Sequence, residues 1–138
     1  PQANRILALV QGSVHAGAQE LVACKRMDTN TGGVFLSPGM VMVQNAECPL
    51  WQEEVFGPVL AIQVFDEDDQ AFALAEHPVY GLAAGVHTAS LPRAMRAIRT
   101  LKAGTVWVNR YGRSSDFFIP TGWFGGSGLG YNLCMQAF

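Results

Sequence analysis

The sequence predicts an α/β protein with an open, mostly parallel sheet and flanking helices. Strand and helix patterns alternate along residues 59–109, and this order is typical of βαβ units with right-handed crossovers. The composition agrees, because 49% of the 138 residues are hydrophobic and only 14% are charged. A disordered chain has the opposite balance, so we expect a buried core. The low charged fraction also indicates a surface that the rest of a larger protein covers.

The N-terminal half combines one helix with short extended segments. We predict the helix at residues 2–19, because apolar residues recur there at helical spacing. These residues are Ile6, Leu7, Val10 and Val14. Residues 21–24 and 35–43 are apolar and read as extended, with a turn signal at residues 30–33 between them. Pro38 cannot donate to a sheet ladder, so we expect it at the edge of a strand.

The C-terminal half carries the strand–helix alternation. The predicted strands are Val59–Phe65, Leu82–His87 and Thr105–Asn109. Asp66 is the expected N-cap of the first intervening helix, which should end before Pro78. Its expected buried stripe is Ala71, Leu74 and Ala75.

The second intervening helix should begin near Pro92 and end at Gly104. Its expected apolar face consists of Ala94, Ile98 and Leu101. Its basic residues should face outward, and they are Arg93, Arg96, Arg99 and Lys102. The following stretch, residues 110–130, is glycine-rich and aromatic, as loops that build sites in α/β sheets often are.

Charge and cysteine content exclude several kinds of partner. A net charge of −2 argues against nucleic acid and anionic lipid, because phosphate binding needs a basic face. No apolar run approaches the roughly 18 residues of a membrane span, and no signal peptide is visible. The three cysteines, Cys24, Cys48 and Cys134, fit neither a disulfide framework nor a zinc site. We therefore expect no metal and a reducing, cytoplasmic location.

Two features could carry chemistry but are more simply structural. The segment Gly125–Gly130 does not satisfy GxGxxG, so we predict a tight turn there and not a dinucleotide loop. A cysteine nucleophile needs a base within hydrogen-bond reach, and His15, His77 and His87 are the candidates. No local signature surrounds any cysteine, so we predict no catalytic residue within this chain.

The segment 53–59 reads EEVFGPV, with two acids directly before an aromatic residue, a glycine and a proline that lead into a strand. On physical grounds alone, a solvated acidic turn with Phe56 plugging the core is the simpler interpretation. The functional interpretation is a carboxylate and a ring held together at a strand entrance. A carboxylate can accept hydrogen bonds from two sugar hydroxyls, and a ring supplies a flat wall.

This segment resembles a signature of the aldehyde dehydrogenase superfamily, and other motifs match in the same order. They are residues 80–86 (YGLAAGV), residues 103–109 (AGTVWVN) and the loop at 120–130. The resemblance covers nearly all 138 residues. It implies that residues 1–138 are the C-terminal part of the catalytic domain of a longer, oligomeric enzyme. The catalytic cysteine and the general-base glutamate of the family are not expected in this part.

The resemblance also implies an activity and specific roles. Members of the family oxidise aldehydes to acids with NAD or NADP, through attack by a cysteine thiolate. Glu54 matches the residue that holds the nicotinamide ribose, and Phe56 matches the ring beside the cofactor. Gln2 and Arg5 match further ribose contacts, with arginine in place of the more usual lysine. Asn109 begins the loop of the substrate funnel, and Phe117 and Phe118 are expected as its apolar walls.

Four positions depart from the family pattern. Trp123 and Cys134 stand where glycine is usual, Gly125 where lysine is usual, and Gly39 where threonine is usual. A bulky residue at a glycine turn demands a different backbone angle, because only glycine visits positive φ cheaply. These departures suggest a diverged or decayed copy. Two other hypotheses stay open: a non-catalytic α/β module of the same fold, and a small ligand-binding protein that uses the loop of residues 117–130. The enzyme hypothesis requires Glu54 to open toward a cleft at the carboxyl side of a parallel sheet.

Overall fold

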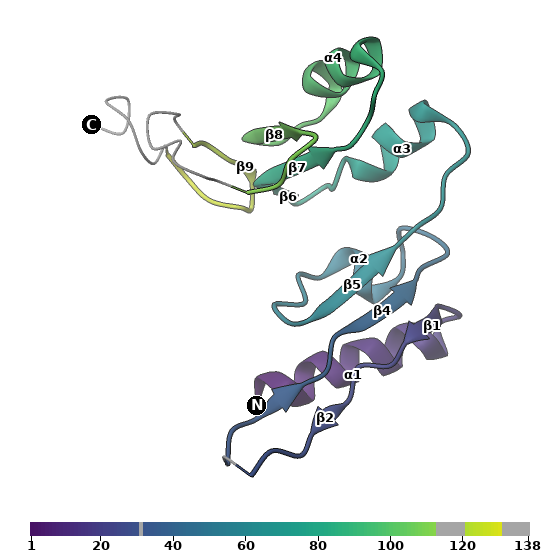
Figure 1. Ribbon diagram of the computed structural model, residues 1–138, viewed down its shortest axis with the longest axis vertical. Helices are drawn as coiled ribbons and strands as arrows, with labels where there is room; N and C mark the ends of the chain where they lie inside the picture. The colour runs from purple at the N-terminus through teal and green to yellow at the C-terminus, as the bar shows by residue number, and fades with distance from the viewer. Residues whose placement is uncertain (31, 113–120, 131–138) are drawn as a thin grey trace. The chain divides into compact units, whose positions relative to one another are not determined.

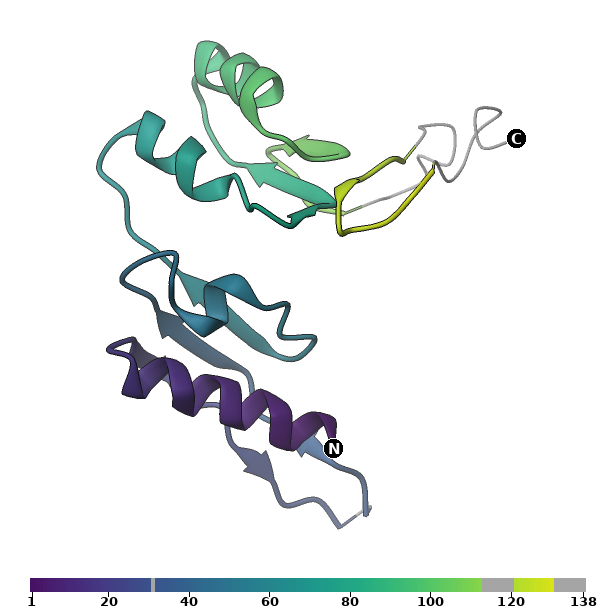
Figure 2. The ribbon, with the colours of Figure 1, turned by 180° about the vertical axis from the view of Figure 1, so that it is seen from behind.

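The computed structural model describes residues 1–30, 32–112 and 121–130. The chain divides into two compact units, Pro1–Val64 and Phe65–Phe138, and each is described by itself. Figures 1 and 2 show the elements of both units from opposite sides. No helix among the described residues has the length and the apolar character that crossing a membrane requires.

The first unit places two helices on one face of a small mixed sheet. Its elements are α1 (Gln2–His15), β1 (Gln19–Val22), β2 (Arg26–Met27), β3 (Phe35–Leu36), β4 (Gly39–Met42), α2 (Pro49–Gln52) and β5 (Val59–Ile62). The three-stranded sheet has the order β1-β4-β5, with β1 antiparallel and β5 parallel to β4. Strands β2 and β3 form a separate antiparallel pair. Figure 2 shows α1 and α2 in front of this sheet.

The core of this unit lies between the helices and the central strand β4. Val41 of β4 is fully buried, and Val43 directly follows that strand. Val10 of α1 and Leu50 of α2 pack into the same cluster. The buried stripe of α1 consists of Ile6, Val10 and Ser13, whereas the predicted Val14 is 38% exposed. The sequence pattern therefore identified the correct face of α1 but missed its last buried residue by one position.

The second unit contains a parallel strand pair, an antiparallel strand pair and two helices. Its elements are α3 (Asp68–Ala75), β6 (Tyr80–Gly81), β7 (Ala83–Val86), α4 (Leu91–Thr100), β8 (Thr105–Val108) and β9 (Phe124–Gly125). β7 pairs with β8 in parallel, and the helix α4 connects them, as the βαβ pattern predicts. β6 pairs with β9 antiparallel, which brings the start of the glycine-rich segment beside Tyr80.

The helices of this unit bury residues that differ in part from those predicted. In α4 the buried residues are Ala94 and Ala97, while Ile98 is 47% exposed. In α3 the buried residue is Phe72, whereas Ala71 and Leu74 are half-buried and Ala75 is exposed. The prediction is therefore confirmed at Ala94, whereas the buried Phe72 and Ala97 lie one position from the expected Ala71 and Ile98. Small residues suit the contact face of α4, because they let another element approach the helix closely.

Ion pairs join α3 and α4 on the outside of the second unit. Both oxygens of Asp68 accept from the Nε of Arg93, at 2.9 and 2.7 Å. Arg96 pairs with Asp69, and its guanidinium carbon lies 4.9 Å from the ring centroid of Phe72. Lys102 pairs with Glu76. The prediction that the basic residues of this helix face outward is confirmed.

The α/β class is confirmed, with differences in pairing and boundaries. β5 pairs in parallel with β4 in the first unit, and β7 pairs in parallel with β8 in the second. Antiparallel pairs occur beside the parallel ones, which makes the sheets more mixed than expected. Glu67, not Asp66, is the N-cap of α3, and α4 ends at Thr100 before the expected Gly104.

Candidate functional site

The candidate site is the loop of residues 53–58, which leads from α2 into β5. The pairing of Gly39 with Val59 aligns the beginnings of the parallel strands β4 and β5. The loop therefore lies at the amino end of this strand pair. The expectation that Glu54 lies at the carboxyl side of a parallel sheet is wrong, because the loop precedes its strand.

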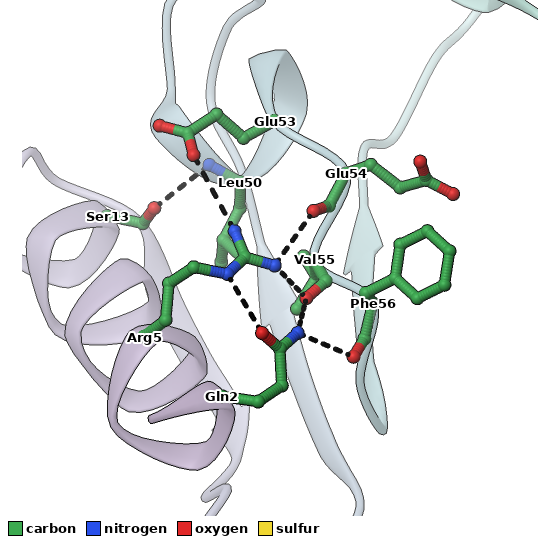
Figure 3. A network of polar contacts seen from close by, with 8 residues as sticks. All are labelled: Gln2, Arg5, Ser13, Leu50, Glu53, Glu54, Val55 and Phe56. Atoms are coloured by element: carbon green, nitrogen blue, oxygen red, sulfur yellow. Dashed lines mark hydrogen bonds and ion pairs between the residues drawn. The ribbon is translucent and has the colours of Figure 1, made fainter. Parts of the chain in front are cut away.

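The first turns of α1 hold this loop by its backbone. Arg5 donates from Nη2 to the carbonyl oxygens of Glu54 and Val55, at 3.2 and 2.6 Å. Gln2 donates from Nε2 to the carbonyl oxygen of Phe56 at 3.2 Å and approaches that of Val55 at 3.5 Å. Figure 3 shows both side chains reaching from α1 to successive carbonyl groups of the loop. Residues about 50 positions apart in the sequence are thereby joined.

The two acids of the loop differ in their surroundings. The carboxylate of Glu53 lies 3.8 Å from Nη1 of Arg5 in an exposed ion pair. The side chain of Glu54 is exposed, and within the described part of the chain its carboxylate makes no hydrogen bond or ion pair. In Figure 3 this carboxylate points away from α1. Glu54 is therefore the acid that is available to a ligand.

Phe56 is exposed and has an unusual backbone conformation. Its side chain is 75% exposed, so the interpretation of a ring that plugs the core is wrong. Its φ angle is +49°, a left-handed value that is uncommon for a bulky residue. Such a conformation costs about 1–3 kcal/mol and persists only when neighbouring contacts impose it. Gln2 supplies one such contact, and Ile6 packs against the place where a side chain at Gly57 would lie.

Ser13 holds the helix that precedes the loop, a role that the sequence reading missed. The N-cap of α2, Cys48, makes no side-chain capping bond. Instead the hydroxyl of Ser13 accepts from the backbone N–H of Leu50 at 3.1 Å, and Ser13 is fully buried. A polar residue three positions after Val10, within the apolar stripe, was the available signal.

We expect Ser13→Ala to lower the free energy of unfolding by about 2 kcal/mol, because a buried N–H would lose its acceptor. Urea denaturation of the protein that carries this chain measures the loss. Ser90→Ala is the matched control, since Ser90 caps α4 but is only half-buried. Water can replace that cap, so the control should cost about 1 kcal/mol or less. Equal losses in the two variants would mean that the buried bond of Ser13 stabilises the fold no more than the half-buried cap of Ser90.

Asn109 lies at the carboxyl end of the parallel pair in the second unit. Its Oδ1 accepts from the N–H of Thr88 at 2.8 Å, and its Nδ2 donates to the Thr88 carbonyl at 2.9 Å. Its φ angle is +54°, which asparagine tolerates better than most residues. Asn109 thus fixes the start of the next loop. The predicted funnel residues Phe117 and Phe118 lie outside the described residues.

The cysteines within the described residues are buried free thiols, Cys24 and Cys48. Burial, and then the nearby carboxylate of Glu20, raises the pKa of the Cys24 thiol. A raised pKa keeps this thiol protonated at neutral pH, which is unfavourable for a nucleophile. The described residues also contain no group of three or more His, Cys, Asp or Glu side chains that could hold a metal ion.

The fold and the loop define an α/β protein segment with a free carboxylate and an exposed ring side chain, both supplied by one loop. The profile of the aldehyde dehydrogenase family matches residues 1–138, so the chain belongs to this family. An aldehyde dehydrogenase of Aspergillus niger is 37% identical over 132 residues. That match covers 96% of this chain and 26% of the relative. An aminoacetaldehyde dehydrogenase of Pseudomonas aeruginosa is 40% identical, with 80% of this chain and 22% of the relative covered.

Solved structures give the same family. An indole-3-acetaldehyde dehydrogenase in complex with NAD+ has a TM-score of 0.90 and 36% identity, and the match covers 99% of this chain and 27% of that one. A betaine aldehyde dehydrogenase from Staphylococcus aureus in complex with NAD+ has a TM-score of 0.90 and 30% identity, with coverage of 99% and 27%. The chain therefore spans about a quarter of the length of the relatives that it matches.

Proposed function

We propose that residues 1–138 are the C-terminal part of the catalytic domain of an aldehyde dehydrogenase that uses NAD or NADP. In this proposal the whole enzyme oxidises a small aldehyde to a carboxylic acid through a cysteine thiohemiacetal. The catalytic cysteine and the general-base glutamate lie outside this segment. The loop lies at the amino end of its strand pair, so the proposal does not rest on the expected placement of Glu54 at the carboxyl side of a sheet. The observation that carries the proposal is the match of the aldehyde dehydrogenase family over residues 1–138. The exposed carboxylate of Glu54, which has no partner of its own among the described residues, supports it.

Glu54 accepts hydrogen bonds from the hydroxyl groups of the nicotinamide ribose, and the ring of Phe56 flanks the bound cofactor. A carboxylate is suited to this task, because its two oxygens together accept from two neighbouring hydroxyls. The bound cofactor supplies the hydride acceptor. Fixing the ribose reduces the freedom that must be lost before reaction, and this is how the loop accelerates the hydride step. Asn109 positions the funnel loop, and Phe117 and Phe118 contribute its apolar walls.

The remaining parts of the proposal concern the whole protein. The enzyme works in the cytoplasm as a homo-oligomer and binds neither nucleic acid nor membrane. The net charge of −2 supports the last two points, since both partners attract basic surfaces. Oxidation of an aldehyde by the purified protein, with NAD and with NADP in separate assays, tests the enzyme class. Failure with both cofactors would favour a non-catalytic module of the same fold.

We expect Glu54→Gln to slow hydride transfer about ten- to a hundredfold, the range for losing charge-assisted hydrogen bonds. Single-turnover formation of the reduced nucleotide, followed by absorbance, measures this step. Glu53→Gln is the matched control, because it removes the neighbouring acid that pairs with Arg5. An exposed ion pair contributes little, so the control should change the rate less than about threefold. Wild-type rates in Glu54→Gln would refute the assigned role of this acid.

A further inference from the structure

We propose that His77 is a positioning residue that holds the glycine-rich segment, residues 121–130, in place through the turn that leads into β6. This inference deepens the proposed function and rests on it, because the funnel loop that begins at Asn109 ends where this segment begins. From the sequence, His77 was only a candidate base. Its contacts indicate a different task, which is to accept hydrogen bonds from the backbone.

The imidazole of His77 organises the turn between α3 and β6. Its Nδ1 accepts from the backbone N–H groups of Val79 and Tyr80, each at 3.1 Å. The ring also stacks on that of Tyr80, with centroids 4.9 Å apart and planes inclined by 29°. Pro78 has a fixed φ angle and disfavours a helical backbone at the residue before it, so α3 ends ahead of this turn. One side chain therefore sets the direction in which the chain enters β6.

The residues of this turn attach the glycine-rich segment to the second unit. The carbonyl oxygen of Val79 accepts from the N–H of Gly126 at 2.6 Å. The N–H of Gly81 donates to the hydroxyl of Ser127 at 2.9 Å. β6 and β9 form their antiparallel pair at the same place, as Figure 1 shows. The N–H groups that His77 holds thus belong to residues that carry the attachment.

This attachment fixes one end of the funnel loop. The loop begins at Asn109, whose side chain bonds to the backbone of Thr88. Its other end runs into the glycine-rich segment at Thr121. In the proposed function this loop contacts the aldehyde and not the nucleotide. A loosened segment should therefore impair use of the aldehyde and leave the binding of NADH unchanged.

Three substitutions separate the acceptor of His77 from its ring. His77→Asn keeps an acceptor, because an asparagine oxygen commonly bonds the N–H two residues further on and has lone pairs for both donors. His77→Phe keeps a ring that can stack on Tyr80 but has no acceptor. His77→Ala removes both. His77→Asn should therefore behave like the wild type, whereas the other two variants should not.

Hydrogen exchange followed by mass spectrometry, on the protein that carries this chain, measures the attachment directly. In His77→Ala and His77→Phe, peptides from residues 121–130 should exchange about fivefold faster, the size of one lost neutral hydrogen bond. At saturating nucleotide, kcat/KM for the aldehyde should fall about fivefold for the same reason. The Kd for NADH should not change. His15→Ala is the matched control, because His15 is an exposed histidine on α1 of the first unit, and it should alter none of these quantities.

The possible results distinguish the parts of the inference. Unchanged exchange in both His77→Ala and His77→Phe would overturn it. Equally fast exchange in His77→Asn would overturn the role of the acceptor, since the ring would then be the important part. Faster exchange with an unchanged kcat/KM, or with a weaker Kd for NADH, would overturn the link to the aldehyde. A wild-type protein that oxidises no aldehyde would instead refute the proposed function, while the exchange data would still decide the role of His77 in the attachment.

A variant on the other side of the attachment guards against loss of folding. If only His77→Asn folds, the need for an acceptor is established, and Ser127→Ala tests the link to the aldehyde. This change removes the acceptor of the Gly81 N–H without altering the turn. It should produce the same faster exchange and the same fall in kcat/KM. Wild-type values of both quantities in Ser127→Ala would overturn the inference.

Discussion

Replacement of Gly104 by alanine should destabilise the second unit by about 3 kcal/mol or more, because rigid backbone lies in the way. A Cβ at this position would overlap the carbonyl group of Gly122 and lie 2.8 Å from the backbone nitrogen of Trp123. Gly104 itself cannot shift away without loss, since its backbone N–H donates to the carbonyl oxygen of Gly81 at 3.0 Å. The free energy of unfolding, measured by urea denaturation, should fall accordingly.

Gly85→Ala provides the control for this experiment. Gly85 lies in β7, whose partner strand β8 directly follows Gly104, but a Cβ at Gly85 would meet only Tyr111 Cδ2 at 3.7 Å and the Arg110 oxygen at 3.9 Å. Those are ordinary contacts, and the substitution reduces the freedom of the unfolded chain. We expect a change within about 0.5 kcal/mol of wild type. Similar losses for the two variants would contradict a steric cause at Gly104.

Replacement of Gly39 by alanine should cost about 3 kcal/mol by crowding the strand next to the candidate site. A Cβ on Gly39 would lie 2.6 Å from the Cβ of Cys24 and 3.1 Å from its backbone nitrogen. Cys24 is buried, and Gly39 begins β4 with a backbone bond to Pro58 at 2.8 Å. Threonine, the usual residue of the family here, would meet the same atoms. The lack of a side chain at Gly39 therefore leaves the space that Cys24 occupies.

Second-site variants test whether the Cβ of Cys24 is the cause. Cys24→Gly removes this atom, so it should recover about half of the loss in the Gly39→Ala background. Cys24→Ala keeps the Cβ and should recover nothing, although it also removes the sulfur. Urea midpoints of the two double variants give the comparison. Recovery by both second-site changes would show that the sulfur, and not the Cβ, causes the crowding.

The other departures from the family pattern have local explanations where the residues are described. Non-glycine residues with positive φ within the described ranges are Phe56 and Asn109, so the expected backbone problem at Trp123 does not arise. Gly128 makes room for the indole, because a side chain there would overlap it. Gly125 has φ +59° and lies against the carbonyl oxygen of Val79. Glycine is therefore the residue that this turn requires, while Cys134 lies outside the described residues.

Sequence patterns predicted most of the helices and strands, but they were less accurate about which helix faces are buried and where the elements end. Hydrophobic periodicity located α1 and α4, and the βαβ order predicted the parallel pairing of β7 with β8. The ends of the elements depend on capping bonds that involve only one or two residues, so the observed ends differ from the predicted ones. The buried faces of α3 and α4 shifted too, because burial of Phe72 and Ala97 depends on the neighbouring helix and strand.

The sequence by itself determined the α/β class and the position of the acidic–aromatic segment at a strand entrance. Both depend on local patterns, namely periodicity and the order of neighbouring residues. Only the tertiary structure decided that Arg5 pairs with Glu53 and leaves Glu54 free, and that Phe56 is exposed. It also decided that Gln2 and Arg5 bind carbonyl groups of the loop. These contacts join positions about 50 residues apart, and their geometry follows from the packing of α1 against the sheet.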